Sequence, residues 1–210
     1  MARRRVPEVV VRRLAVYLRI LREADLSDNR FVSSAELGEW AGVTPAQVRK
    51  DLAMFGEFGK QGVGYQGRNL RDELARILNT DETVAVAIIG MGELGAALAR
   101  YIQRRHAGNR EYPFRAVALF DVDPAKVGVS VEGVAIDHLD ALPERVREQK
   151  VKLAVVSVPA AAAQAVTDRA VAAGVRAILD FAPVKLRVPP HVRVHYADVS
   201  LELHQLAFYL

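Results

Sequence analysis

The chain has 210 residues, of which 51% are hydrophobic and 26% are charged. These proportions are typical of a globular protein and exclude a disordered chain, which could not bury enough apolar surface to fold. No apolar run reaches the roughly 18 residues of a membrane span. The absence of cysteine excludes disulfides, thiolate metal sites and a cysteine nucleophile. We expect a cytoplasmic protein with no metal, no membrane association and no secretory signal.

The net positive charge is confined to the first eighty residues. Residues 1–80 contain 14 Lys and Arg against 10 Asp and Glu, whereas residues 81–210 contain 15 of each kind. A basic segment joined to a neutral one indicates a polyanion-binding module on a scaffold of different purpose. The alternative is a soluble surface with a chance asymmetry of charge.

The hydrophobic period also changes near residue 80. Before it, apolar residues recur at helical spacing, and after it short β-rich runs alternate with alanine-rich helical stretches. The sequence Asn-Thr-Asp at 79–81 is the expected junction, because these residue types favour caps and turns. The predicted parts are 1–80, 81–198 and a C-terminal helix over 199–210.

The basic part carries the pattern of a helix-turn-helix. Helices are expected over 7–24, over 33–40 and from 45 onward. Ser33 and Glu36 fit a capping box, and Thr44 with Pro45 fits a helix start. Gly42 lies in the short turn between the second and third helices. In a helix-turn-helix the second helix of the pair enters the major groove of DNA. An αα-hairpin that happens to carry polar residues is the alternative.

The third helix presents side chains that suit base edges. Gln47 can bond bidentately to adenine, Arg49 or Lys50 to guanine, and Ala46 can contact a thymine methyl group. On the first helix, Arg12 lies opposite the apolar face, where a guanidinium can contact phosphate. The alternative for Arg12 is a solvated helix face.

A glycine-rich segment over 56–65 follows the third helix and predicts a β-hairpin, the wing of a winged helix. Its tip is expected to place Lys60 and Arg68 on a phosphate strand or in the minor groove, and a helix over 69–78 closes the domain. A nucleotide phosphate loop is disfavoured, because Gly-Lys-Ser/Thr and a preceding buried strand are missing. The predicted DNA-binding residues are Arg12, Ser33, Ala46, Gln47, Arg49, Lys50, Lys60 and Arg68.

The neutral part begins with a dinucleotide-binding pattern. A buried strand over 83–89 leads into Gly90-Met91-Gly92-Glu93-Leu94-Gly95, and a helix follows over 94–105. In this context the first glycine allows a tight turn, the second lets the backbone approach a pyrophosphate, and the third lets the helix pack on the strand. The helix N-terminus offers free N–H groups to phosphates.

The second strand, over 115–120, ends at Asp121. A carboxylate at this position bonds ribose hydroxyls and repels a 2′-phosphate, which favours NAD over NADP. Asp123 is a nearby competitor, but it precedes Pro124 and is expected to start a turn.

The strand and helix alternation continues and predicts a doubly wound parallel sheet. Strands are expected over 134–136, 151–158, 177–180 and 192–195, with helices over 139–149 and 159–173. Ligands bind at the carboxyl ends of such strands, so we place the nicotinamide near Pro159 and Phe181-Ala182-Pro183. A doubly wound fold with another ligand, or with none, is the alternative. The predicted cofactor-binding residues are Gly90, Met91, Gly92, Glu93, Leu94, Gly95, Asp121, Ser157, Pro159, Phe181 and Pro183.

The sequence gives no sign of an enzyme. The five histidines lie in no recognisable catalytic motif, although a dehydrogenase needs a general acid or base at its substrate. The C-terminal helix carries an apolar stripe that includes Leu203 and Leu206, which must be buried either in its own chain or, as we prefer, on a second subunit. A small NAD-dependent oxidoreductase with an accessory basic domain and a non-redox ligand sensor are the rival interpretations.

The motifs at 48–52, 55–65 and 90–95, in this order, resemble those of the Rex family of redox-sensing transcriptional repressors. The resemblance covers nearly the whole chain. It implies an α/β protein with a winged helix-turn-helix domain, a Rossmann-like domain and a dimerisation helix exchanged between subunits of a homodimer. It also implies that the homodimer binds an inverted-repeat operator in double-stranded DNA, that NADH lowers this affinity, and that NAD+ leaves the protein competent to bind.

The resemblance further suggests a polar link between the two halves at Arg13, Tyr101 and Asp198. An ion pair between Arg13 and Asp198, made in one dimer arrangement and broken in the other, would be the switch. The alternative is that Asp198 caps its helix and Arg13 faces solvent. Because the predicted nicotinamide site is apolar and disfavours an unpaired cation, we expect NADH to bind more tightly than NAD+.

Overall fold

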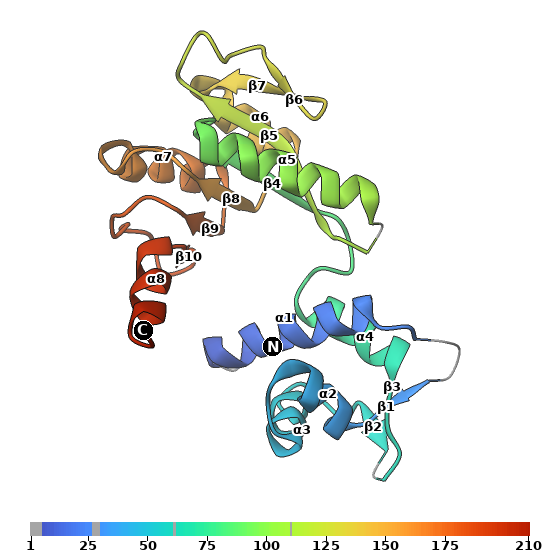
Figure 1. Cartoon of the computed structure of the whole chain (residues 1–210). Helices are drawn as coiled ribbons and strands as arrows, with labels where there is room; N and C mark the ends of the chain where they lie inside the picture. The colour runs from blue at the N-terminus through green and yellow to red at the C-terminus, as the bar shows by residue number, and fades with distance from the viewer. Residues whose placement is uncertain (1–5, 27–29, 61, 110) are drawn as a thin grey trace. The chain divides into compact units, whose positions relative to one another are not determined.

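The computed structural model describes residues 6–26, 30–60, 62–109 and 111–210. The chain divides into two compact units, residues 1–82 and residues 83–210 (Figure 1). Each unit has its own hydrophobic core and is described by itself.

The N-terminal unit is a winged helix-turn-helix, which confirms the prediction. Its helices surround a core that includes Leu14, Tyr17, Val48 and Leu74, and a small antiparallel sheet lies in the order β1–β3–β2. Strands β2 and β3 form the predicted wing, whereas β1 was not predicted. The elements are α1 (Glu8–Glu23), β1 (Phe31–Val32), α2 (Ser34–Ala41), α3 (Pro45–Ala53), β2 (Gly59–Lys60), β3 (Gly64–Gln66) and α4 (Gly67–Ile77).

Local signals determine where α2 and α3 begin and end. The Ser33 hydroxyl accepts a hydrogen bond from the Glu36 N–H, and the Glu36 carboxylate accepts one from the Ser33 N–H. Gly42 ends α2 in the left-handed region, with φ of 69°. Thr44 then caps α3 by accepting a hydrogen bond from the N–H of Gln47. These caps satisfy backbone groups that helix ends leave unpaired.

The C-terminal unit is built on a sheet in the order β10–β9–β8–β4–β5–β7–β6, parallel except for the pairing of β6 with β7. The chain leaves β4 for β5 on one side and returns to β8 on the other. The elements are β4 (Val84–Ile89), α5 (Glu93–Gly108), β5 (Phe114–Asp121), β6 (Ser130–Val131), β7 (Val134–His138), α6 (Leu142–Glu148), β8 (Leu153–Val156), α7 (Ala160–Ala173), β9 (Ala177–Asp180), β10 (Arg193–Tyr196) and α8 (Val199–Ala207).

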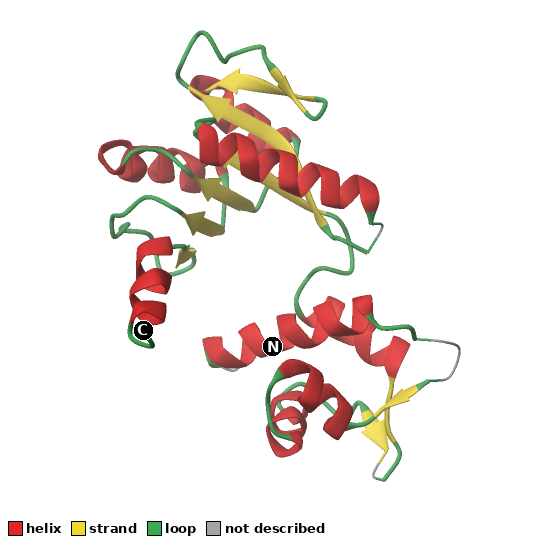
Figure 2. Cartoon of the chain, viewed as in Figure 1, coloured by secondary structure: helices red, strands yellow, loops and turns green. Residues whose placement is uncertain are grey.

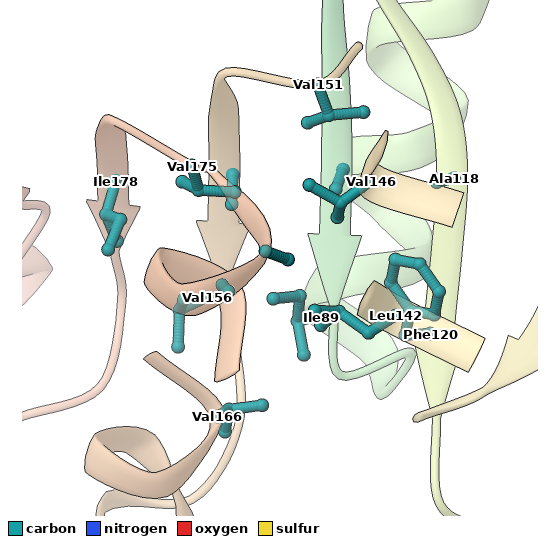
Figure 3. Close-up of a cluster of buried hydrophobic side chains, with 14 of the residues drawn as sticks. Ile89, Ala118, Phe120, Leu142, Val146, Val151, Val156, Val166, Val175 and Ile178 are labelled. Atoms are coloured by element: carbon teal, nitrogen blue, oxygen red, sulfur yellow. The ribbon is translucent and has the colours of Figure 1, made fainter. Parts of the chain in front are cut away.

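Helices cover both faces of this sheet (Figure 2). Helices α6 and α7 pack with Ile89, Phe120 and Val156 in one buried cluster (Figure 3), and α5 packs with Ile88 and Leu119 in another. Burial on both faces explains why these strands read as continuous apolar runs.

Several predicted boundaries differ from the structure. The helix expected over 139–149 is split into a 3₁₀ turn, Leu139–Ala141, and α6, because Pro143 occupies the first turn of α6 and lacks the N–H that a continuous helix requires. Strand β8 is shorter than the predicted 151–158. Strand β6 was not predicted, and it joins β7 through Glu132 and Gly133, both with positive φ. No helix among the described residues is long and apolar enough to cross a lipid bilayer.

Candidate functional site

The predicted base-reading helix, α3, presents Ala46, Arg49 and Lys50 as exposed residues, and Gln47 is partly buried. The Nη1 atom of Arg49 donates a hydrogen bond of 2.9 Å to the Oγ of Ser34. This contact ties the exposed side of α3 to the first turn of α2, the two helices that a helix-turn-helix sets against DNA.

A hollow of about 630 Å³ lies between α3 and the wing. It brings together three of the predicted DNA-binding residues, Ser33, Arg49 and Lys60, which come from separate elements. Aromatic and apolar side chains form much of its remaining wall. The lining residues are Ser33, Ser34, Arg49, Leu52, Ala53, Gly56, Glu57, Phe58, Gly59, Lys60, Gly62, Val63, Gly64 and Tyr65.

Arg68 does not lie at the tip of the wing, so this part of the prediction was wrong. The Gln66 side chain accepts a hydrogen bond of 2.6 Å from the N–H of Asn69 and caps α4, which therefore begins at Gly67 and includes Arg68. The Nε atom of Arg68 donates to the carbonyl oxygen of Leu26 at 3.0 Å. Lys60 is exposed on β2 as expected, and Arg12 is exposed on α1.

Sequence reasoning missed a buried carboxylate on α3. The side chain of Asp51 is 1% exposed and accepts hydrogen bonds from two side chains of α1 and from one side chain of α3. Arg13 donates through Nε at 2.6 Å and through Nη2 at 2.7 Å, the hydroxyl of Tyr17 donates at 3.0 Å, and Nε2 of Gln47 donates at 2.7 Å. We call Arg13, Tyr17, Gln47 and Asp51 the Asp51 cluster.

The electrostatics of the Asp51 cluster favour the charged carboxylate. Burial raises the pKa of Asp51, but hydrogen bonds from Arg13, Gln47 and Tyr17 and the charge of Arg13 outweigh it, and the pKa lies below its ordinary value. Burial and the hydrogen bond to Asp51 raise the pKa of Tyr17. The cluster thus joins α1 to α3 through an ionised group.

In the C-terminal unit, the glycine-rich turn follows β4 at the carboxyl edge of the sheet. Gly90 has φ of 94°, and its N–H donates to the carbonyl oxygen of Phe120 at 2.8 Å. The Ser157 hydroxyl donates to the Gly90 carbonyl oxygen at 2.9 Å. Ser157, predicted to contact the cofactor, therefore supports the turn from the end of β8.

The glycines of this turn differ in the free space around them, in the way that a phosphate-binding turn requires. A Cβ built on Gly95 would overlap the carbonyl oxygen of Gly90, and one on Gly90 would lie 2.6 Å from the carbonyl oxygen of Ser157. A Cβ on Gly92, in contrast, would meet no atom of the described residues within 4 Å. Gly92 is also the N-cap of α5, and no side chain caps this helix. The space beside Gly92 and the uncapped helix N-terminus fit a pyrophosphate.

The carboxylate of Asp121, predicted to bind ribose hydroxyls, already accepts four hydrogen bonds within the protein. Its Oδ2 accepts from the N–H of Met91 at 2.7 Å and from Nζ of Lys126 at 3.2 Å, and its Oδ1 accepts from the N–H groups of Val122 and Asp123 at 2.8 and 2.9 Å. Burial raises the pKa of Asp121, but these hydrogen bonds outweigh it and lower the pKa. A ribose hydroxyl would therefore have to displace Lys126, which is the one side chain among these donors.

The predicted nicotinamide region lies where β8 and β9 end. Pro159 precedes α7, and Phe181 and Pro183 follow β9, with Pro159 and Pro183 exposed. Sequence reasoning missed Asp180, the last residue of β9, which is 1% exposed. Its Oδ1 accepts from the N–H of Ala182 at 3.0 Å, and its Oδ2 has no hydrogen-bond partner among the described residues. Burial raises the pKa of Asp180.

Each of the three predicted switch residues has a partner within its own unit. Arg13 pairs with Asp51, which differs from the solvent-facing alternative. The hydroxyl of Tyr101 accepts a hydrogen bond from Arg105 at 3.1 Å. Asp198 caps α8 by accepting from the N–H of Ser200 at 2.9 Å, as the alternative stated.

Helix α8 leaves its apolar side chains uncovered. It follows β10, at the edge of the sheet (Figure 1). Leu203 and Leu206 are 61% and 63% exposed, and Leu201, Phe208 and Leu210 are also exposed. The stripe is therefore not buried in its own chain, and a second subunit remains its expected cover.

Comparisons with known proteins cover both units. A family model described as a putative DNA-binding protein N-terminus matches residues 5–53, and one described as a CoA binding domain matches residues 81–184. The first match lies in the N-terminal unit, and the second lies almost wholly in the C-terminal unit.

Similar proteins extend over nearly the full length. The redox-sensing transcriptional repressor Rex of Roseiflexus sp. (strain RS-1) is 46% identical over 97% of this chain and 90% of its own. That of Geobacillus kaustophilus (strain HTA426) is 42% identical over 98% of this chain and 94% of its own.

Solved structures of a Rex-family repressor are also similar to this chain. RSP, a Rex-family repressor, is 34% identical in its complex with β-NAD+ and operator DNA, with a TM-score of 0.86 over 97% of this chain and 92% of RSP. Its complex with β-NADH has a TM-score of 0.82 at 32% identity, over 98% of this chain and 94% of RSP. The curated relatives are transcriptional repressors, so the oxidoreductase interpretation is set aside in favour of a regulator. The chain belongs to the Rex family of redox-sensing transcriptional repressors.

Proposed function

We propose that this chain acts in the cytoplasm as a homodimeric repressor that binds an inverted-repeat operator and is released from it when NADH binds the C-terminal unit. The observation that carries the proposal is the presence in one chain of a winged helix-turn-helix and of a glycine-rich turn with open space beside Gly92. RSP, of the same family, has been solved with NAD+ and operator DNA and with NADH.

The cofactor acts in this proposal as a regulatory ligand that is not turned over. Gly90, Gly92 and Gly95 form the cradle for the pyrophosphate, with the backbone of Met91, Glu93 and Leu94 between them. Pro159, Phe181 and Pro183 would face the nicotinamide, which is cationic in NAD+ and neutral in NADH. Apolar neighbours favour the neutral form, so NADH binds more tightly.

The two ligands are linked through the equilibrium between two dimer arrangements. If NADH weakens DNA binding by some factor, DNA weakens NADH binding by the same factor. The uncovered stripe on α8 supports a dimer, which also matches the two half-sites of an inverted repeat.

The test is fluorescence anisotropy on a labelled inverted-repeat duplex at fixed salt, because phosphate contacts make the affinity steeply salt-dependent. We expect NADH to release the duplex at concentrations at which NAD+ does not. Release by neither cofactor would assign the C-terminal unit to another ligand. Failure to bind DNA in any state would contradict the proposal as a whole.

The proposal includes a switch in which Arg13, Tyr101 and Asp198 connect the units of the dimer. Removing Arg13 would also strip Asp51 of its cation, so the cleaner variant is Asp198→Ser, which keeps a capping oxygen and removes the charge. We expect this variant to bind the operator but to need at least about tenfold more NADH for release, which corresponds to a lost coupling of about 1.4 kcal/mol. An unchanged NADH response in Asp198→Ser and Tyr101→Phe would exclude the switch.

A further inference from the structure

The carboxylate of Asp51 has its acceptor positions filled by the described residues. Arg13 and Tyr17 donate to Oδ2, and Arg13 and Gln47 donate to Oδ1, at distances of 2.6 to 3.0 Å. An ionised carboxylate has about four lone-pair positions and no hydrogen to donate. At 1% exposure, Asp51 is held in one position by α1 and by its own helix.

This arrangement orients the amide of Gln47. Gln47 lies in the first turn of α3, one helical turn before Asp51, and its Nε2 donates to Oδ1 at 2.7 Å. The opposite orientation would set the amide oxygen against a carboxylate oxygen, and neither atom could donate. Because the oxygen and nitrogen of an amide lie on different sides of its carbon, fixing Nε2 on Asp51 also fixes Oε1 away from it.

We propose that Asp51 is a positioning residue for base recognition, which holds the Gln47 amide so that Gln47 reads an exocyclic amino group, adenine N6 or cytosine N4, through Oε1. This inference rests on the proposed operator binding. It adds to the adenine contact predicted from the sequence by fixing which side of the amide faces away from Asp51. The amide nitrogen has two hydrogens, so the one that is not bonded to Asp51 can still donate to the adenine N7 atom.

The same geometry places Arg13 next to base recognition. Arg13 supplies two of the hydrogen bonds that hold Asp51, and Gln47 shares the Oδ1 acceptor with it. A change in the pairing of Arg13 therefore reaches the base-reading side chain through a single carboxylate.

The first experiment identifies the base pair that Gln47 reads. Wild-type protein and Gln47→Ala each select duplexes from a library of randomised inverted repeats. The position that Gln47 reads is the one at which the wild-type protein prefers a particular base pair and Gln47→Ala does not. Every base pair offers one exocyclic amino group in the major groove, adenine N6 or cytosine N4, so the selection identifies the base whose amino group is then removed. Replacing that base, in both half-sites, by its analogue without the amino group should weaken wild-type binding about tenfold and leave Gln47→Ala unchanged.

The second experiment tests the role of Asp51 in this preference. Asp51→Asn should lose the discrimination between the natural base and the analogue, and the double variant with Gln47→Ala should lose no more. A purely structural role would lower affinity for all duplexes equally, so thermal unfolding and affinity for unrelated DNA are measured in parallel.

Distinct results would overturn the inference. They are an unchanged wild-type affinity for the duplex that lacks the amino group, an equal loss of affinity for that duplex in wild-type protein and in Gln47→Ala, or full discrimination by Asp51→Asn. The first two come from wild-type protein and Gln47→Ala, so they hold even if Asp51→Asn does not fold. If wild-type protein enriches no duplex at all, the proposed function itself fails.

Discussion

At the scale of single residues, two buried aspartates show how neighbours decide what a charge does to stability. Asp51 and Asp180 are equally buried, each 1% exposed. Asp51 has a bidentate arginine and two further donors, whereas Asp180 accepts from one backbone N–H and leaves Oδ2 without a partner among the described residues. The pKa of Asp51 is lowered and that of Asp180 is raised by burial. The first charge therefore stabilises the fold, and the second destabilises it.

Asp51→Asn is expected to destabilise the N-terminal unit by about 3 kcal/mol, because it removes the buried charge to which the partly buried Arg13 is paired. Since the folded pKa of Asp51 lies below the unfolded value of about 4, its contribution is present above that pH and is lost as the pH falls through the folded pKa. Urea unfolding followed by fluorescence of Trp40, the single tryptophan, measures this unit at a series of pH values.

The matched control is Asp72→Asn, because Asp72 is 52% exposed on α4. Its loss should cost less than about 1 kcal/mol, as is usual for surface pairs. Equal effects of the two substitutions at neutral pH would show that the Asp51 cluster adds no more than a surface contact.

Asp180→Asn is expected to stabilise the C-terminal unit at neutral pH, by on the order of 1 kcal/mol. The folded pKa of Asp180 lies above its unfolded value, so the cost of the buried charge is present above the folded pKa and disappears as the pH falls through it toward the unfolded one. The gain should therefore shrink on acidification. Thermal unfolding followed by circular dichroism at neutral and acidic pH checks the sign, and a destabilised variant would show that the charge is compensated.

At the scale of elements, the connection from β4 through the glycine-rich turn to α5 separates residues needed for folding from residues needed for binding. Gly95 and Gly90 are closed in by backbone, whereas the space beside Gly92 is open. The helix start at Gly92 has φ of −69°, which any residue adopts. Substitutions at these glycines should therefore have different consequences.

Gly92→Ala is expected to change the stability of the unit by no more than about 1 kcal/mol but to weaken NADH binding at least about tenfold, because the methyl group occupies the space of the pyrophosphate. Gly95→Ala, the control, should lower the unfolding temperature, because its methyl group overlaps the Gly90 carbonyl oxygen. Calorimetric titration with NADH and thermal unfolding separate the two effects. Unchanged NADH affinity in Gly92→Ala would place the pyrophosphate elsewhere.

The sequence predicted well those elements whose signals are local. The capping residues Ser33, Thr44 and Gly174 lie next to the helix ends that they define. The Asp51 cluster could not be predicted, because Arg13 and Tyr17 are 38 and 34 residues from Asp51 and only packing brings them together. The wrong position of Arg68 followed from overlooking a glutamine as a helix cap.

The candidate cofactor site was predictable to the same extent. The glycine spacing identified the turn, because Gly90, Gly92 and Gly95 lie within six consecutive residues. The saturation of Asp121 was not predictable, since one of its donors, Met91, lies 30 residues away and another is the side chain of Lys126.

At the scale of the whole molecule, α8 is the feature that a single chain leaves incomplete. Its leucines are exposed and its one acidic cap is satisfied within the helix. Surfaces of this kind are typical of an interface between subunits, and a symmetric dimer would cover the stripe of each subunit.

Leu203→Asp with Leu206→Asp is expected to weaken dimerisation at least about a hundredfold, because each leucine contributes on the order of 1.5–3 kcal/mol when buried. The operator affinity should fall with it, while each unit keeps its fold. Sedimentation velocity over a range of concentrations measures the dimer, and Glu202→Gln on the same helix is the control. A variant that remains dimeric would place the interface on another surface.

The hydrogen bond from Met91 to Asp121 has a kinetic consequence for a sensor. Because Asp121 and Ser157 already hold the turn, ligand binding has little backbone to order, and the entropic cost of forming the site is small. Association then proceeds without waiting for a loop to close, and differences in affinity between ligands appear mainly as differences in residence time. The delay between a fall in NADH and the return of the protein to DNA is therefore set by how long each bound molecule stays.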